Sequence, residues 1–318
     1  MAIMGGYDLT MVGLEAESTF GSDPTAGLVR WPGLVQNLPN ITEDYGKSVV
    51  RGLGSGRDPG LFYRTKKEVA LTIESLLMSD DSGAESIFGL ALGTSPDGST
   101  GVITNSDLLR SFTIETGWHD GSSGWYELFT GCVINLLSLQ MQTGEACVLT
   151  CDSFVKDVTR STTETTRSGD NLSALTPSTA DPFTFEDVTV AFTGITDPIV
   201  TEMTIDINNN LNRIYALNGS ATIANSFATK RDITGSFTIV KENNTLRDIF
   251  TANPNANAGK QTITVTLSKN TGTEFLKLTL TDCRLLSRSF DRPGDDVNEL
   301  TETYDFHAAS IAVDTKTP

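Results

Sequence analysis

Acid–base chemistry at neutral pH depends mainly on histidine, and this sequence has only two histidines, His119 and His307. His119 lies in the stretch GWHDGSSGW, whose glycines and serines are typical of an exposed hairpin tip. His307 lies in YDFHAAS, near the last expected strand. Neither stands in a pattern of the Ser-His-Asp or Cys-His kind. We interpret both as surface histidines, so the sequence gives an enzymatic function little support.

The stretch RGLGSGRDPG, residues 51–60, has the glycines of a phosphate-binding loop. It lacks the terminal Lys-Ser/Thr of a P-loop, and it leads into an expected strand, whereas a phosphate site needs the start of a helix. We therefore interpret it as a loop whose glycines form turns and whose Arg57 and Asp58 meet another protein surface.

Metal binding and disulfide bonding are also poorly supported. Cys147 and Cys151 are separated by four strand steps, about 13 Å, which exceeds the roughly 7 Å that a disulfide spans. Neither they nor Cys132 and Cys283 show the C-x2-C spacing of a zinc site. The acidic turn DRPGDD, residues 291–296, does not have the spacing of a defined calcium loop. We expect four buried thiols, solvated acidic turns and no cofactor.

The charge balance limits the partners of the protein. The formal net charge is −17 and the sequence pI is about 4.4, so the surface repels phosphate and anionic membranes. No stretch approaches the roughly 18 consecutive apolar residues of a membrane span, and the N-terminus has no basic region followed by an apolar core. We expect a soluble protein that is made in a cytoplasm, with no membrane partner.

The chain repeats itself. TKKEVALTIESLL (residues 65–77) is echoed by TKRDITGSFTIVK (residues 229–241), with Lys230 in the position of Lys66. Apolar residues alternate in both stretches, which predicts a half-buried strand in each. A length of 318 residues suits two domains of about 150 residues.

The repeat continues beyond these strands. Residues 82–93 predict a short helix that ends at Gly93, and the stretch NNTLRDIFTANP predicts another, with Asn244 as its N-cap. Further on, GWYELFTGCVINLLSLQM corresponds to TEFLKLTLTDCRLLSRSF, which pairs Cys132 with Cys283. Each half then has the order strand, long loop, strand, short helix, hairpin, strand.

These patterns predict a mainly β protein with two tandem sandwich or barrel domains, related by internal duplication and each carrying one short helix. The alternative is that two β-rich halves resemble each other by chance. The expected organisation is an N-terminal arm (1–34), a first β domain (35–156), a Ser/Thr-rich linker or arm (157–182) and a second β domain (183–318).

The segment from residue 43 to residue 77, together with the earlier stretches EAESTFGSDP and RWPGLVQNLPN, resembles the tail tube proteins of viruses with long non-contractile tails that infect bacteria and archaea. In that family a long loop carries a string similar to R-x-L-G-S-x-R-D-P. The residues that fit this string are Arg51, Leu53, Gly54, Ser55, Arg57, Asp58 and Pro59. The second half keeps the loop length and Arg213 but has no RDP.

The resemblance implies a virion structural protein without enzymatic activity. Single-domain members form hexameric rings, so a tandem protein is expected to form trimeric, pseudo-hexameric rings that stack into a tube. The implied partners are further copies of the chain, the tape measure, terminator and distal tail proteins, and double-stranded DNA that passes through without specific binding. The loop string is the candidate ring-stacking element.

The strand ELTETYDF is a candidate for the channel wall, with Glu299, Thr301 and Thr303 on one face. Plain solvent exposure of these residues is the alternative. Two other functions also stay open. One is another virion β-domain protein, such as a terminator, distal tail or decoration protein. The other is a surface- or carbohydrate-binding sandwich that uses Trp118 and Trp125 as its platform.

Overall fold

The computed structural model describes residues 11–24, 27–31, 33–35, 37, 39–51, 61–79, 82–94, 101–119, 124–169, 171–175, 180–252, 259–269, 275–291 and 300–315. The first half contains β1 (Met11–Ala16), β2 (Val29–Arg30), β3 (Gly33–Val35), β4 (Asn40–Val50), β5 (Leu61–Leu77), α1 (Ser82–Leu92), β6 (Val102–Thr104), β7 (Phe112–His119), β8 (Gly124–Gln142), β9 (Val148–Val155) and β10 (Asp157–Ser161).

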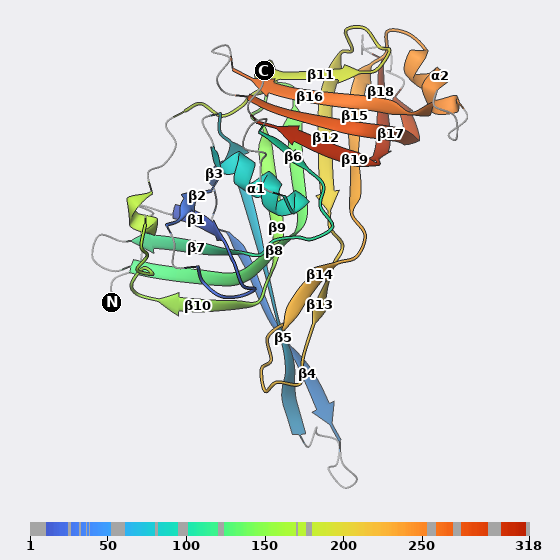
Figure 1. Ribbon diagram of the computed structural model, residues 1–318. Coiled ribbons are helices and arrows are strands. Elements are labelled where there is room, and N and C mark those ends of the chain that lie inside the picture. The colour runs from blue at the N-terminus through green and yellow to red at the C-terminus, as the bar shows by residue number, and fades with distance from the viewer. Residues whose placement is uncertain are drawn as a thin grey trace.

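The second half follows two 3₁₀ turns, η1 (Leu172–Ala174) and η2 (Phe185–Asp187). It contains β11 (Val188–Phe192), β12 (Val200–Asn208), β13 (Leu211–Ile214), β14 (Asn225–Ala228), β15 (Asp232–Val240), α2 (Thr245–Thr251), β16 (Gln261–Ser268), β17 (Phe275–Asp291), β18 (Thr301–Ala308) and β19 (Ser310–Asp314). The protein is mainly β with a short helix in each half, as the sequence predicts (Figure 1).

One antiparallel sheet runs through both halves, and we call it the central sheet. Its strand order is β4-β5-β9-β8-β12-β15-β18-β17, so four strands come from each half. The halves meet where β8 pairs with β12, and this seam places Leu137 opposite Ile207 and Leu139 opposite Ile205. The seam is therefore apolar on the face that points into the core.

An outer sheet covers the core face of each half. In the first half it has the order β2-β1-β7-β8-β10, and in the second half the order is β11-β16-β17-β19-β6. The long strands β8 and β17 belong to both layers, because each bends from the outer sheet into the central sheet. The bends contain Gly131 and Asp282, whose φ angles are 64° and 53°.

The two halves share one order of strand pairing. The pairs β1–β7, β4–β5, β5–β9, β7–β8, β8–β9 and β8–β10 correspond to β11–β16, β12–β15, β15–β18, β16–β17, β17–β18 and β17–β19. Details inside the strands match as well, since Gly131 directly precedes Cys132 at one bend and Asp282 directly precedes Cys283 at the other. Helices α1 and α2 follow equivalent strands, β5 and β15.

The predicted helix ends are largely confirmed. Gly93, directly after α1, has a φ of 84°, a conformation that glycine adopts without steric cost. Asn244 is the N-cap residue of α2, but its side chain makes no capping bond. The side chain of Asn243 accepts a hydrogen bond from the Thr245 amide instead, at 2.9 Å.

The stretches expected as an arm and a linker contribute packed structure. Strand β1 lies within residues 1–34, and the buried Trp31 donates a hydrogen bond from Nε1 to Ser75 Oγ at 3.0 Å. Strand β10 lies within residues 157–182 and pairs with β8. Further along, Arg167 is buried against Glu115. The Ser/Thr-rich composition concealed β10 because a strand held through its backbone needs few apolar side chains.

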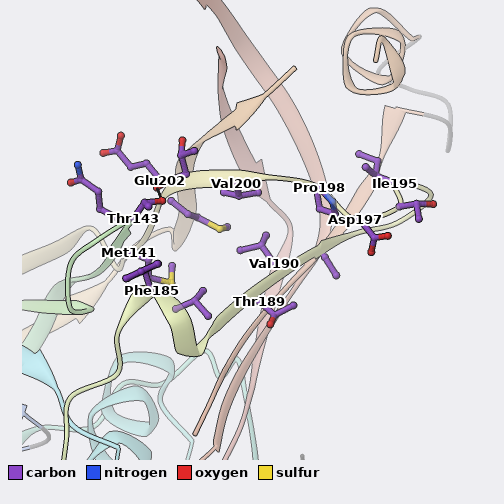
Figure 2. Close-up of a pocket in the computed structure, with 16 residues that line it drawn as sticks. Met141, Thr143, Phe185, Thr189, Val190, Ile195, Asp197, Pro198, Val200 and Glu202 are labelled. Carbon is purple, nitrogen blue, oxygen red and sulfur yellow. Dashed lines mark hydrogen bonds between the residues drawn. The ribbon is translucent and has the colours of Figure 1, made fainter. Parts of the chain in front are cut away.

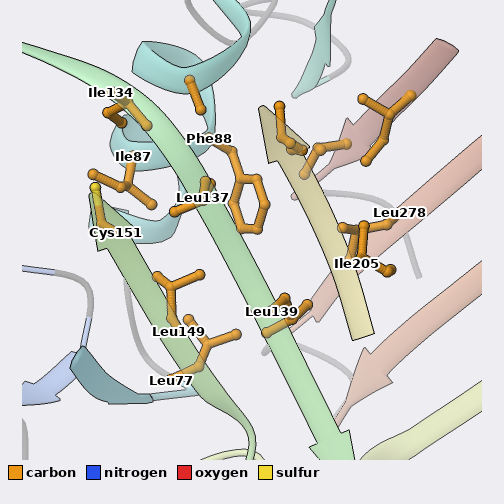
Figure 3. Close-up of a cluster of buried hydrophobic side chains, with 14 of the residues drawn as sticks. Leu77, Ile87, Phe88, Ile134, Leu137, Leu139, Leu149, Cys151, Ile205 and Leu278 are labelled. Carbon is orange, nitrogen blue, oxygen red and sulfur yellow. The ribbon is translucent and has the colours of Figure 1, made fainter. Parts of the chain in front are cut away.

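The core is continuous across the seam. Buried residues from α1, the central sheet and both outer sheets form one apolar cluster. Phe88 of α1 lies between β8 and β12, close to Leu137 and Leu139 of the first half and Ile205 of the second (Figure 3). The two halves therefore bury each other's apolar surface and should not unfold independently.

We expect Ile207→Ala to destabilise the protein by about 2–5 kcal/mol, because it opens a cavity at the seam, where Ile207 is 1% exposed. Urea unfolding followed by tryptophan fluorescence and by far-UV circular dichroism should show one transition moved to lower urea. The matched control is Leu217→Ala, an exposed leucine that should cost less than about 0.5 kcal/mol. Two separated transitions in the unmutated protein would contradict the shared core.

Candidate assembly surfaces

A long hairpin projects from the body of the protein, formed by the ends of β4 and β5 (Figure 1). We call residues 46–51 and 61–66 the hairpin arm. Its strands pair with each other out to Val50 opposite Leu61. Its exposed large apolar residues are Val49, Val50, Leu61, Phe62 and Tyr63. Phe62 is 74% exposed, and exposed apolar side chains gathered on one projecting hairpin mark a contact with another macromolecule.

The hairpin arm is also basic. It carries Lys47, Arg51, Arg64 and Lys66, in a protein whose formal net charge is −17. The Arg64 guanidinium lies 4.6 Å from the ring centre of Tyr45, and Lys66 pairs with Glu68 at the base. An acidic partner with apolar surface complements the arm, and a second copy of this acidic chain has the required charge.

In the sequence, the predicted ring-stacking string lies between the two strands of this hairpin. Arg51 directly follows β4 and is exposed. Leu53, Gly54, Ser55, Arg57, Asp58 and Pro59 lie between β4 and β5 but outside the described residues. Among the other sequence candidates, Trp125 is partly exposed on β8. His119 is the last residue of β7 and pairs with Gly124 of β8, which agrees with the hairpin that the GWHDGSSGW stretch predicts.

The second half has an equivalent segment, which lies beside β5 (Figure 1). Residues 209–231 have the same length as 45–67 and contain β13 and β14. This segment folds back onto the first half, where the Arg213 guanidinium lies 3.7 Å from the ring centre of Phe154. The Lys67 amide donates to Ala221 O at 2.8 Å. The second-half loop thus packs on the neighbouring half.

Buried polar groups fasten the same junction. Asn209 donates from Nδ2 to Ala91 O and to Ile134 O, both at 3.0 Å. Arg231 holds the Asn209 side-chain oxygen at 3.0 Å and donates to Ser106 O at 2.8 Å. Second-half side chains therefore satisfy backbone carbonyls around the end of α1, which fixes the position of one half against the other.

The central sheet ends in two open edges. Among the described strands, β4 pairs only with β5, and residues 284–291 of β17 pair only with β18. These two strands are the equivalents of β12 and β8, which pair with each other at the seam. Unpaired backbone groups along an edge favour pairing with another chain. The protein therefore has two open edges, β4 and β17, whose equivalents β12 and β8 already pair with each other within the chain.

The face of the central sheet that points away from the core is polar. Hydroxyl groups hold carboxylates on it: Thr72 bonds to Asp152 and Ser138 bonds to Asp206, each at 2.5 Å. Its further acidic residues include Asp44, Glu74, Glu202 and Asp305. We call this surface the polar face.

The channel-wall candidates of β18 belong to the polar face. Thr301 and Thr303 alternate with the buried Glu302 and Tyr304, and Thr303 shares a 2.9 Å hydrogen bond with Thr238. Glu299 lies outside the described residues.

A buried ionic cluster lies beside the open edge of β17. Glu302 accepts hydrogen bonds from Arg288 at 2.6 Å and from the Tyr304 hydroxyl, and Lys241 lies 2.9 Å from it. Burial alone would raise the pKa of Glu302. The bonds from Arg288, Tyr304 and Lys241 outweigh burial and lower the pKa from 4.5 to about 2. Glu302 is therefore ionised at neutral pH and holds Arg288 in place along the edge.

A cavity of about 690 Å³ opens between β11 and β12 (Figure 2). Met141, Phe185, Val190 and Val200 are among the residues that line it. In the first half, the longer connection between β1 and β4 carries β2, β3 and the buried Trp31. The second half joins β11 to β12 through the short segment 193–199. The cavity thus lies where the second half has no counterpart of β2 and β3 among its described strands.

The four cysteines are buried free thiols, as expected. Burial raises the pKa of the Cys147, Cys151 and Cys283 thiols to about 12, so they are neutral at pH 7. Within the described residues, no group of three His, Cys, Asp or Glu side chains is arranged to hold a metal ion. Across the same residues, no helix is long and apolar enough to cross a membrane.

Comparison with protein families identifies a relationship that covers most of the chain. The family model described as phage tail tube protein matches residues 9–308, which is nearly the whole chain. No curated protein matches the chain.

The low pKa of Glu302 makes a prediction for acid stability. Because the folded-state pKa lies below the unfolded value, this carboxylate stabilises the fold above about pH 4.5, and the contribution is lost as the pH falls toward 2. We expect Glu302→Gln to cost about 2 kcal/mol at pH 7 and almost nothing at pH 2. Urea unfolding between pH 7 and pH 2 measures the difference. The exposed Glu186→Gln is the control, and a Glu302→Gln cost that does not vary with pH would contradict the assignment.

Proposed function

The chain belongs to the phage tail tube protein family, and from this premise we propose that it forms trimeric rings that stack into the tube of a viral tail. Membership of the family makes it a structural component of the virion tail. In the proposed ring each chain fills two of six equivalent places, one with each half. The two halves then derive from a duplicated module, and each chain is made in the host cytoplasm before assembly.

The observation that carries this proposal is the seam between β8 and β12. It joins two halves of the same pairing order side by side within one sheet. The open edges, β4 and β17, are the equivalents of the two strands of that seam. A second chain that repeats the β8–β12 type of contact extends the central sheet by eight strands, four from each of its halves. In the proposed ring the rotation between neighbouring halves is one sixth of a turn, so the sheet closes on itself and the open edges are paired.

The polar face is the proposed wall of the channel. The core face of the central sheet is already covered by the outer sheets and α1, so the polar face is left to line the hole. Its carboxylates repel DNA phosphates within about 8 Å at physiological salt, which lets double-stranded DNA pass without adhering. Thr301 and Thr303 lie on this face, and we place Glu299 at the same wall.

The hairpin arm is the proposed contact between stacked rings. Its apolar side chains and basic charge suit the acidic surface of the next ring, and the string from Arg51 to Pro59 joins its two strands in the sequence. The further proposed partners are the tape measure, terminator and distal tail proteins. These partners follow from the family resemblance.

Ring composition can be measured directly. We expect negative-stain images of the concentrated protein to show rings or tubes with a central hole. Native mass spectrometry of single rings should give three times the chain mass of 34.2 kDa. Rings of six chains would contradict the two-places-per-chain arrangement. Protein that stays monomeric both alone and with purified virion tail tips as initiators would contradict the proposed function.

The stacking role of the hairpin arm has its own test. Deletion of residues 52–60 should leave folded rings but abolish long tubes, because the rings lose their axial contact. Phe62→Ser should weaken stacking in the same direction, and the exposed Leu217→Ser is the matched control. Sedimentation velocity and electron microscopy measure ring and tube fractions. Unchanged tubes in the deletion variant would refute the stacking role.

A further inference from the structure

The internal pairing order assigns each residue of β4 and β17 an equivalent at the seam. Glu43 of β4 pairs with Val69 of β5, and Ile207 of β12 pairs with Ile233 of β15. Ile207 follows Glu43 in the sequence by the same number of residues as Ile233 follows Val69. Ile207 of β12 is therefore equivalent to Glu43 of β4. The same spacing holds along the strand and places Ile41 at the position equivalent to Ile205.

Strand β17 aligns with β8 in the same way. Three independent features agree on one alignment: the bends at Gly131 and Asp282, the buried cysteines at 132 and 283, and the register shifts toward β9 and β18. The register shift skips residue 135 in β8 and residue 286 in β17. Arg288 is thereby equivalent to Leu137 and Phe290 to Leu139.

The register of the seam can therefore be transferred to a contact between chains. Because Leu137 lies opposite Ile207, the transferred register places Arg288 opposite Glu43 of the next chain. We propose that the β17 edge of one chain docks on the β4 edge of the next in this register, and that the Arg288–Glu43 ion pair is its specificity-determining contact. This inference rests on the proposed ring and names the residues that close it.

The charges of the two edges fit this pairing. The Glu43 side chain is 21% exposed and contacts Arg160 and, at 3.7 Å, Lys67 on its own chain. The Arg288 side chain is 23% exposed and contacts Glu302. Docking would join these pairs into one row of alternating charge: Arg160, Glu43, Arg288, Glu302. Both side chains point to the core side of the sheet, where docking removes more water and strengthens charge-assisted bonds.

Apolar contact supports the ion pair on one side. The transferred register places Phe290 opposite Ile41, both of which are half-buried in the single chain. The Arg288 guanidinium already lies 5.3 Å from the ring centre of Phe290. An aromatic ring and an isoleucine at this position would shield the neighbouring ion pair from solvent.

The two seams then differ in chemistry and in consequence. The seam within the chain is apolar and permanent, whereas the seam between chains carries a charge on each edge. A charge that points inward at an open edge disfavours pairing of that edge with an identical edge, because Glu43 would approach Glu43 and Arg288 would approach Arg288. Dead-end dimers are thereby disfavoured, and the β17-to-β4 contact that propagates the ring is the one that brings the two opposite charges together.

Cysteine cross-linking tests the register. The transferred register places Thr42 opposite Ser289 of the next chain, on the polar face, where an engineered pair lies within disulfide range. We expect the double variant Thr42→Cys, Ser289→Cys to give covalent trimers under mild oxidation on a non-reducing gel. The matched control, Thr42→Cys with Ser287→Cys, is two residues out of register and should stay uncross-linked. The native cysteines are buried and do not compete.

The outcomes of the cross-linking separate the two proposals. Rings seen by microscopy without trimers on the gel, or with cross-linking in the control variant, overturn the register and leave the proposed function standing. A protein that forms no rings in any variant, and none when initiated by tail tips, overturns the proposed function together with this inference. Trimers confined to the in-register variant support both.

A second measurement tests the ion pair itself. Glu43→Gln should raise the protein concentration needed for half-maximal assembly at least about tenfold, because Arg288 loses its partner across the seam. The control is Glu127→Gln, since Glu127 also bonds to Arg160, at 2.8 Å, but lies on β8 opposite β10, away from the open edges. It should leave assembly unchanged. Equal effects of the two variants, with circular dichroism showing intact folds, would overturn the role of the ion pair.

Discussion

The structure depends on the pairing of β8 with β12. Each half is a sandwich whose central layer has two edges, and this seam seals one edge of each half against the other. The apolar rows on the core side of the seam, with Leu137 opposite Ile207, join the two cores into one cluster. The buried hydrogen bonds of Asn209 and Arg231 then fix the angle between the two halves. Because that angle is set inside a single chain, any further contact of the same kind inherits a defined geometry.

The long strands β8 and β17 each connect the two layers of one half. The strand segments at the seam and at the proposed chain contact are therefore continuous with strands of the outer sheets. Their outer ends pair within the outer sheets, while their inner ends supply strands to the central sheet. The bends need residues that accept positive φ, and glycine at 131 and aspartate at 282 meet that need. An edge strand that continues into a buried outer sheet is held rigidly. The open end of β17 is thus presented as a preformed template, with little conformational entropy left to lose on docking.

The sequence predicts the parts of the fold that carry periodic apolar side chains. The alternation in residues 65–77 and 229–241 predicts β5 and β15, and both are buried on one face. The match of Cys132 with Cys283 predicts equivalent strands, which the pairing order agrees with. Strand β10 escaped prediction because its pairing is carried by the backbone among polar side chains. The seam escaped because alternation identifies a buried face but not the partner strand.

Buried charges could not be predicted from the single sequence either, since Glu302 is 3% exposed and meets Arg288 only after β17 and β18 pair. The two halves differ at sites that face another half. The second-half segment from 209 to 231 packs on its neighbour, while the equivalent hairpin arm projects. Where Ile207 stands at the seam, the equivalent open edge has Glu43. Such differences are expected of a repeated module that makes the same kind of contact in two ways. The β8–β12 contact forms within one chain during folding, whereas the proposed β17–β4 contact must form between separate chains.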